Sequence, residues 1–301
     1  MPNEVNDVAC FAPRQTPRGV TAPRQERADS PSNRAHGPLA NLRRKISSRL
    51  ARHVALERRR FVNPRPMVSF TFDDAAVSAG LTGAERLERM GGRGTYYIAS
   101  GLVGRSDWGY ALMGRESVRE LHFKGHEIGL HGDAHRAASA FSAQEFRDDL
   151  QKNRDWLESI DEGIRPANFA YPYGLASFAR KRQLYGLVAS SRSTAPGVIV
   201  GDFDPQFLRC VELADRRLTP ELLACYLDAA VRSGGWLIFC SHDIADAPSS
   251  YGCTFGLFQR ALDGAASRGV EIVTIAAGLA RSRAVGKETL SAREAPGPRL
   301  S

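Results

Sequence analysis

Polar residues that could do chemistry follow four short apolar runs of this 301-residue sequence. These polar groups are Asp73-Asp74, His131 with His135, the turn Tyr171-Pro172-Tyr173-Gly174, and Ser241-His242-Asp243. In a fold of repeated strand–helix units, the carboxyl ends of the parallel strands meet at one face, and active sites form there. We therefore expect the four groups, which are distant in sequence, to lie close together in one site.

Each group taken alone has a plainer interpretation. An Asp pair after a strand is usually a turn or a helix N-cap, a Tyr-Pro-Tyr-Gly run is a turn signal, and two histidines are often merely solvated. However, the spacing His-x-x-x-His can also place two imidazoles on one face of a helical turn, where they can bind a divalent metal. Together the groups provide three nitrogen and oxygen ligands, a spare carboxylate, a backbone turn and an additional imidazole, which favours a shared metal site.

Short apolar runs alternate with longer amphipathic stretches after residue 66, which is typical of an α/β fold with a largely parallel sheet. The predicted strands cover residues 67–72, 94–98, 127–130, 168–170, 187–190, 208–211, 236–240 and 270–274. The predicted helices cover residues 81–90, 115–124, 143–160, 175–184, 220–232 and 255–267. Seven or eight such units in about 220 residues favour a closed or nearly closed (β/α) barrel over an open sheet.

The basic character of the protein lies in its N-terminal segment. The formal net charge is +8, but residues 1–65 contain 14 of the 41 Lys and Arg and only 5 of the 33 Asp and Glu. The remainder is nearly neutral, so we expect no nucleic-acid partner for the barrel. Residues 1–38 lack periodicity and are predicted to be a disordered basic tail rich in Pro and Arg.

Apolar residues at steps of three and four predict a basic amphipathic helix over residues 39–61. This helix could dock on the domain, remain solvated, or contact an anionic membrane surface. An adaptor for membranes or nucleic acids, acting through residues 1–65, is the corresponding alternative function. Because the composition changes at Pro64, we predict a helix and linker over residues 39–64, a barrel over 65–282 and a flexible tail over 283–301.

The order of the four motifs resembles that of the polysaccharide deacetylases related to the nodulation-protein chitooligosaccharide deacetylase, which form carbohydrate esterase family 4 and share the NodB homology domain. The resemblance covers residues 67–280 and includes Thr71-Phe-Asp-Asp74, His131 with His135, Pro172-Tyr-Gly174 and Ser241-His-Asp243. It implies a distorted (β/α) barrel of about seven strand–helix units. It also implies metal-dependent N-deacetylation of a GlcNAc-containing polysaccharide, oligosaccharide or glycolipid, of the chitooligosaccharide or exopolysaccharide type.

The resemblance also implies roles for individual residues. These are Asp74, His131 and His135 as ligands of a divalent metal, Asp73 as general base, His242 as general acid, and the Tyr173 N–H as donor to the oxyanion. Elementary chemistry agrees, because a zinc-type ion with three protein ligands keeps a position for water, whose pKa falls to about 7. That metal-bound water can attack the acetamide, and an imidazole can protonate the departing amine. Zn²⁺ is the ion that best matches these expectations.

One residue departs from the family pattern. Many members have an Arg two residues before the Pro of the third motif, where it pairs with the base, and this sequence has Ala170 there. We predict that Arg209, in the apolar run 207–211, pairs with Asp73 instead, because an Arg inside a barrel strand is costly unless it is paired. The alternatives are a structural salt bridge of Arg209 elsewhere, and a non-catalytic relative that binds carbohydrate and metal.

The N-terminal sequence carries no predicted targeting segment. Its first 30 residues contain no apolar run long enough for a signal-peptide core, and no stretch of the chain approaches the roughly 20 apolar residues of a membrane span. We therefore expect a cytoplasmic protein, or one that is peripheral at the inner membrane through residues 39–61. Its expected partner is an N-acetylated saccharide.

Overall fold

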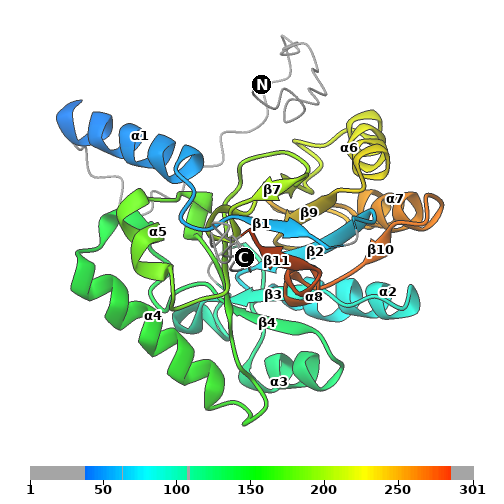
Figure 1. The fold of residues 1–301 in the computed structure, drawn as a ribbon. Coiled ribbons are helices and arrows are strands. Elements are labelled where there is room, and N and C mark those ends of the chain that lie inside the picture. The colour runs from blue at the N-terminus through cyan, green and yellow to red at the C-terminus, as the bar shows by residue number, and fades with distance from the viewer. Residues whose placement is uncertain (1–37, 63, 107–108, 286–301) are drawn as a thin grey trace, which may run out of the picture.

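The computed structural model of the protein describes residues 38–62, 64–106 and 109–285. The predicted disordered tail over residues 1–38 therefore lies, except for its last residue, outside the described residues, and so does most of the predicted flexible tail over 283–301. Within the described part, strands and helices alternate along the chain and build a curled parallel sheet with helices outside it (Figure 1). The predicted α/β barrel-like fold is confirmed.

The sheet has the strand order β6-β5-β4-β3-β2-β9-β8, and β10 pairs with β2. The strands are β2 (Met67–Asp73), β3 (Thr95–Ile98), β4 (Glu127–Leu130), β5 (Asn168–Ala170), β6 (Ser190–Arg192), β8 (Val211–Glu212), β9 (Trp236–Ser241) and β10 (Glu271–Ile272). Every pairing is parallel, as expected for strands joined by helical connections. An isolated parallel bridge joins Arg192 to Leu208, so the edge strand β6 bends toward the segment that leads into β8.

Helices follow most of these strands and cover the outer face of the sheet (Figure 1). The α-helices are α2 (Ala84–Arg89), α3 (Arg115–Phe123), α4 (Ala143–Glu158), α5 (Phe178–Leu184), α6 (Pro220–Ser233), α7 (Phe255–Ala266) and α8 (Ile275–Ala280). Shorter helical segments are η2 (Ala79–Gly83), η3 (Ser100–Leu102), η4 (Ala138–Ala140), η5 (Pro172–Gly174) and η6 (Pro205–Phe207). Helix α4 begins with a capping box, in which Ser142 accepts from the Glu145 N–H and the Glu145 carboxylate accepts from the Ser142 N–H.

A second sheet is antiparallel and has the strand order β11-β1-β7. It consists of β1 (Arg59–Phe61), β7 (Asp202–Phe203) and β11 (Ser282–Ala284). Phe61 stacks on Phe203 at 4.9 Å and meets Trp236 edge-on at 6.2 Å. Because Trp236 is the first residue of β9, this sheet covers the amino ends of the barrel strands. The helix predicted through residue 61 is wrong at its end, because residues 59–61 form strand β1. The flexible tail predicted from residue 283 is wrong at its start, because residues 283 and 284 belong to strand β11.

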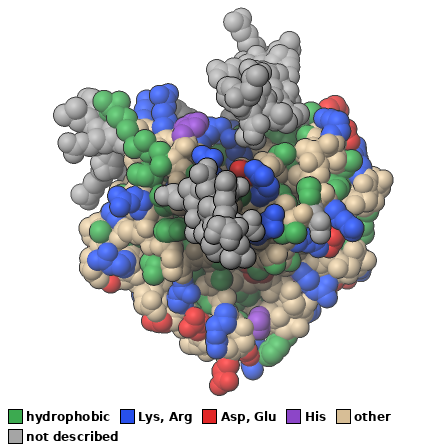
Figure 2. Space-filling model, viewed as in Figure 1, with side chains coloured by type: hydrophobic (Ala, Val, Ile, Leu, Met, Phe, Trp, Pro, Cys, Tyr) green, Lys and Arg blue, Asp and Glu red, His purple; other side chains and the backbone are tan. Residues whose placement is uncertain are grey.

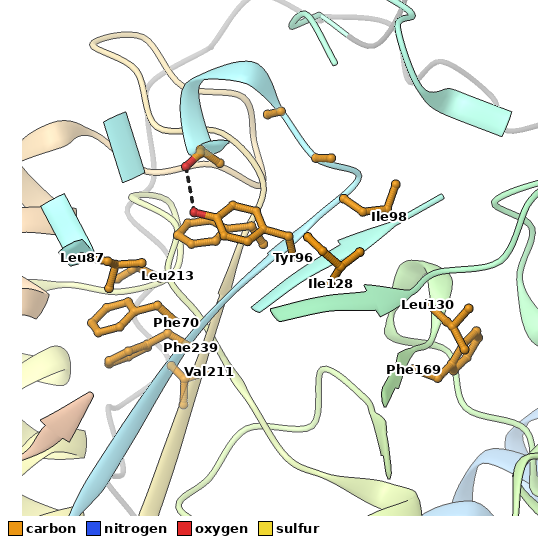
Figure 3. Close-up of a cluster of buried hydrophobic side chains, with 14 of the residues drawn as sticks. Phe70, Leu87, Tyr96, Ile98, Ile128, Leu130, Phe169, Val211, Leu213 and Phe239 are labelled. Atoms are coloured by element: carbon orange, nitrogen blue, oxygen red, sulfur yellow. Dashed lines mark hydrogen bonds between the residues drawn. The ribbon is translucent and has the colours of Figure 1, made fainter. Parts of the chain in front are cut away.

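Side chains of β2 alternate between two buried layers, and this alternation determines the direction of the Asp73 side chain. Phe70 and Phe72 face outward beneath the helices, where Phe72 stacks on Tyr96 at 4.9 Å. Figure 3 shows Phe70 beside Phe239, and the two ring centres are 5.5 Å apart. Thr71 and Asp73 have the opposite parity and face the barrel interior, since successive side chains of a strand point to opposite faces. Asp73 therefore enters the barrel at the carboxyl end of its strand.

Helix α1 (Pro38–His53) lies beside α5 and extends away from the barrel (Figure 1). It confirms the predicted amphipathic helix up to His53. Among the described residues, none of the helices has both the length and the apolar character needed to cross a bilayer.

Candidate metal and catalytic site

The four predicted groups of polar residues do lie near one another at the carboxyl ends of the strands. Four described non-glycine residues have positive φ, and they are Asp74 (61°), Ala75 (64°), His135 (46°) and Tyr173 (60°). Three of these four are predicted site residues. Such backbone conformations cost about 1–3 kcal/mol each and are concentrated at functional sites, where the surrounding structure holds them in place.

Asp74, His131 and His135 form one buried cluster. Oδ1 of Asp74 lies 3.0 Å from Nε2 of His135 and 3.4 Å from Nε2 of His131. One potential ligand atom from each of the three residues lies within 4.8 Å of the other two. Burial raises the pKa of Asp74, but the adjacent imidazoles outweigh it and hold this pKa well below its usual value.

The cluster has the properties of a site for a divalent ion. Oδ1 of Asp74 is buried and forms no hydrogen bond of normal geometry with any described residue. The Nδ1–H of His131 donates to the carbonyl of Ala170 at 2.9 Å, which leaves Nε2 with its lone pair facing Asp74. One carboxylate oxygen and two imidazole nitrogens are a donor set typical of zinc-type ions. The residues present therefore fit the implied metal.

A loop, and not a helix, brings the two histidines together. The sequence predicted a helical turn from His131 to His135, but this segment is irregular and His135 is left-handed. The amide of Asn153, in α4, fixes the start of the loop, because it accepts from the His131 N–H at 3.0 Å and donates to the Ile98 carbonyl at 3.0 Å. The two imidazoles converge because α4 anchors this loop.

Gly132 is required in this loop. Its φ is +75°, and a Cβ there would lie 2.7 Å from Oδ2 of Asp149. The same carboxylate accepts from the backbone N–H groups of Asp133 at 3.2 Å and Ala134 at 2.8 Å. A glycine suits the position after the first histidine ligand candidate, because the backbone is left-handed there and the Asp149 carboxylate occupies the place of a side chain.

The candidate base Asp73 is held by an arginine that the sequence analysis missed. Nη2 of Arg192 bonds to both carboxylate oxygens of Asp73, at 2.6 Å for Oδ2. Arg192 is the direct neighbour of Ala170 across the pairing of β5 with β6. Arg209 does not make this contact, because its guanidinium points to the carbonyl of Pro196 at 3.4 Å. The prediction that Arg209 holds Asp73 is therefore wrong, and Arg192 supplies the charge from the adjacent strand.

The ion pair of Asp73 with Arg192 is enclosed by the barrel. The side chain of Arg192 is completely buried, and that of Asp73 is 6% exposed. The guanidinium lies 5.1 Å from the ring centre of Tyr97, and its Nη1 is 3.3 Å from Sγ of Cys210. Burial raises the pKa of Asp73. The charges of Arg192 and of two histidines of the site lower this pKa by more in total, so it is below the usual value. Asp73 is thus held as a carboxylate.

His242 directly follows β9 and reaches the same site. Its Nε2 lies 3.9 Å from Oδ2 of Asp74, and its side chain is 22% exposed. The backbone N–H of His242 donates to the Tyr251 carbonyl at 3.2 Å, and the two rings are 5.3 Å apart. An imidazole that borders both the candidate metal cluster and solvent can exchange protons with either, which suits the predicted general acid.

Tyr173 lies over one of the candidate metal ligands. It belongs to η5, and its hydroxyl donates to the backbone carbonyl of His135 at 3.2 Å. The two rings are 4.8 Å apart, and Tyr173 remains 42% exposed. The left-handed backbone of Tyr173 therefore belongs to the rim of the site, and the function of its N–H as an oxyanion donor stays a prediction.

The sequence did not lead us to two residues of the site, Asn153 and Arg192, and only Asn153 has a sequence pattern that indicates its role. The buried positions of α4 are Phe146, Leu150, Asn153 and Leu157, so Asn153 is a polar residue on an otherwise apolar helix face. Such an exception marks a buried hydrogen-bonding function. Arg192 lies in the polar run of residues 190–194, where no apolar alternation indicates a strand.

Comparison with known proteins gives the same fold. The sequence profile of a family described as polysaccharide deacetylase matches residues 62–185. The chitin deacetylase of the fungal pathogen Colletotrichum lindemuthianum is 18% identical, with a TM-score of 0.52 over 72% of this chain and 88% of that one. A mutant of a carbohydrate esterase family 4 pseudoenzyme, with restored enzymatic activity, is 17% identical, with a TM-score of 0.51 over 72% and 69% of the chains. No curated protein matches the chain.

Proposed function

We propose that this chain, which belongs to the polysaccharide deacetylase family, is a metal-dependent hydrolase that removes N-acetyl groups from a GlcNAc-containing saccharide or glycolipid. One observation carries the proposal. The buried cluster of Asp74, His131 and His135 lies directly beside the enclosed pair of Asp73 and Arg192. The cluster matches a metal site, and the pair matches a general base that is kept ionised.

Amide hydrolysis first needs a deprotonated water next to a polarised carbonyl. Asp74, His131 and His135 would hold a divalent ion, which supplies Lewis-acid activation of the carbonyl and of water. Asp73 accepts a proton from the attacking water while the oxygen of that water forms a bond to the carbonyl carbon. Arg192 keeps the carboxylate of Asp73 charged and oriented.

The second step breaks the bond between carbon and nitrogen. The backbone N–H of Tyr173, at the rim of the site, stabilises the negative charge on the former carbonyl oxygen. His242 donates a proton to the amine as it departs, so the products are acetate and a free amino sugar. The closeness of His242 to Asp74, 3.9 Å between Nε2 and Oδ2, supports this role.

A non-catalytic, carbohydrate-binding function is favoured by one sequence feature, which is Ala170 in the place of the usual arginine. The contact of Arg192 with Asp73 weakens that argument, because an equivalent charge reaches the base from β6. We therefore prefer hydrolysis to binding alone.

Acetate release tests the proposal. The purified protein, loaded with Zn²⁺, is incubated with chitooligosaccharides, poly-β-1,6-GlcNAc, peptidoglycan and a bacterial exopolysaccharide. We expect acetate from at least one of them, and a loss of about 10²-fold or more in His242→Ala. His122→Ala, which changes a histidine on the outer helix α3, is the matched control and should retain the parent rate. Metal-loaded protein that releases acetate from none of the four substrates would contradict the proposal.

A further inference from the structure

Helix α1 presents a row of apolar side chains to solvent. Leu42, Ile46, Leu50 and Val54 are 54%, 49%, 41% and 39% exposed, and we call these four residues the apolar stripe. Their spacing of four residues places them along one face of the helix and its first residue beyond. Figure 2 shows hydrophobic side chains along the arm formed by α1, with basic side chains beside them. A row of this kind is uncommon on a soluble protein and indicates an interaction surface.

The stripe faces outward because another face of α1 is fastened to the barrel. Ala51 is completely buried, and Oγ of Ser47 accepts from the backbone N–H of Phe178 at 3.0 Å, at the start of α5. The buried ammonium group of Lys181 donates to the carbonyls of Ala51 at 2.7 Å and Val54 at 2.8 Å. These contacts fix the rotation of the helix, so the stripe cannot turn inward without breaking them.

The charges of α1 specify the partner. Its sequence contains no Asp or Glu but five basic residues, Arg43, Arg44, Lys45, Arg49 and Arg52. A second copy of α1 would bring like charges together. The parts of the chain outside the described ends do not complement it either, because residues 1–37 and 286–301 each carry a net charge of +1. The surface of α1 therefore fits a partner that offers both negative charges and an apolar region.

We propose that α1 docks the protein on an anionic lipid bilayer. The helix is 16 residues long, about 24 Å, and would lie in the plane of the headgroups. The apolar stripe enters the boundary of the acyl chains, and Lys45, Arg49 and Arg52 contact lipid phosphates. A nucleic acid would use the same positive charges but would leave the apolar stripe in water, so the bilayer explains both features.

Docking would set the orientation of the candidate site. Helix α5, to which α1 is fastened, begins at Phe178, four residues after η5 ends at Gly174. The loop that carries Tyr173 is therefore joined to the docking helix through α5 and a connection of three residues. The membrane proposal does not depend on the proposed hydrolysis, since lipid binding and acetate release are measured separately.

Vesicle co-sedimentation of the full chain tests the proposal. The protein should bind vesicles that contain phosphatidylglycerol and not vesicles of phosphatidylcholine alone, and high salt should weaken the binding. Ile46→Gln with Leu50→Gln should lower the affinity roughly tenfold or more. Lys45→Gln with Arg49→Gln should lower it about 25-fold, at about fivefold for each charge.

A control changes exposed apolar and basic side chains on other helices. Phe123→Gln with Arg232→Gln removes one exposed apolar and one exposed basic side chain of α3 and α6, and it should bind vesicles like the parent. Circular dichroism melting verifies that every variant is folded. Equal binding by the parent and both α1 variants would overturn the proposal. Binding of RNA without binding of vesicles would also overturn it. The same holds if the protein does not bind vesicles but forms a dimer that Ile46→Gln dissociates.

Discussion

Replacing Arg192 with Met tests the central ion pair of the site. Met has a similar length but no charge, so Asp73 would lose the guanidinium that bonds both of its oxygens. A second substitution can restore a positive charge beside Asp73. Ala170 offers the place, because it is the cross-strand neighbour of Arg192 and belongs to the same interior cluster as Tyr97 and Cys210.

The expected cost follows from burial. The two charge centres of a close ion pair lie about 4 Å apart, and at an effective dielectric constant near 20 their attraction is about 4 kcal/mol. Removing one partner of a buried pair typically costs about 3–5 kcal/mol, because the other charge remains without compensation. A domain of this size has about 5–15 kcal/mol of stability. We therefore expect a folded variant whose melting temperature is about 10 °C lower.

The effect on catalysis should be larger than the effect on folding. Without Arg192 the carboxyl group of Asp73 loses the main charge that opposes the effect of burial, and it takes up a proton more readily. A neutral carboxyl group cannot accept the proton of water, so acetate release should fall by about 10²-fold or more while bound zinc is retained. Ala170→Arg added to Arg192→Met should recover part of the rate.

Acetate release, zinc content by atomic emission and thermal melting are measured on each variant. Arg209→Met is the matched control, because its guanidinium reaches the Pro196 carbonyl and not Asp73. If Arg192→Met hydrolyses substrate at the parent rate, the pair with Asp73 has no part in catalysis. If the rate and the zinc disappear together, Arg192 supports the metal cluster and the reasoning on the base is refuted.

Three further tests probe the metal, the separate roles of the two carboxylates, and the hydrogen bonds that hold α1 against α5. His135→Ala should lower zinc affinity at least tenfold together with acetate release, and unaltered zinc would exclude this ligand. Asp73→Asn should keep zinc but lose most of the rate, whereas Asp74→Asn should lose zinc, so equal zinc loss would contradict separate roles. Lys181→Met should lower the free energy of unfolding by about 2–3 kcal/mol in denaturant titration, because its hydrogen bonds to the end of α1 and its ion pair with Asp204 at 2.6 Å disappear; an unshifted midpoint would show that neither contact stabilises the fold.

The local pattern of apolar and polar residues predicted those strands and helices whose apolar side chains face the core. Strands β4 (Glu127–Leu130) and β5 (Asn168–Ala170) have the predicted bounds, because each contains buried apolar residues next to clear turn signals. The convergence of the motif residues followed from the common geometry of strand ends. That geometry needs no knowledge of side-chain contacts, which is why Asp74, His131 and His135 could be grouped from sequence.

Elements that depend on distant partners could not be read in this way. The apolar run at Leu187 predicted a strand over 187–190, but Leu187 is half exposed and the strand is Ser190–Arg192. Its polar side chains are buried because neighbouring strands satisfy them, as where the Ser190 hydroxyl donates to Asn168 at 2.8 Å. This shift hid Arg192 in a predicted loop. Only tertiary contacts distinguish a buried polar strand from a turn.

The three-stranded sheet at the amino ends of the barrel strands has a consequence for synthesis of the chain. Strand β1 ends at Phe61, yet its partner β11 ends at Ala284, more than 200 residues later. While the chain emerges from the ribosome, Phe61 and the first residues of the barrel have no cover on this side. Pairings of such long range are slow to form, and exposed apolar surface invites aggregation in the meantime. The edge of β1 that pairs with β11 therefore stays unpaired until translation has passed Ala284, whereas its other edge can pair with β7 about 80 residues earlier.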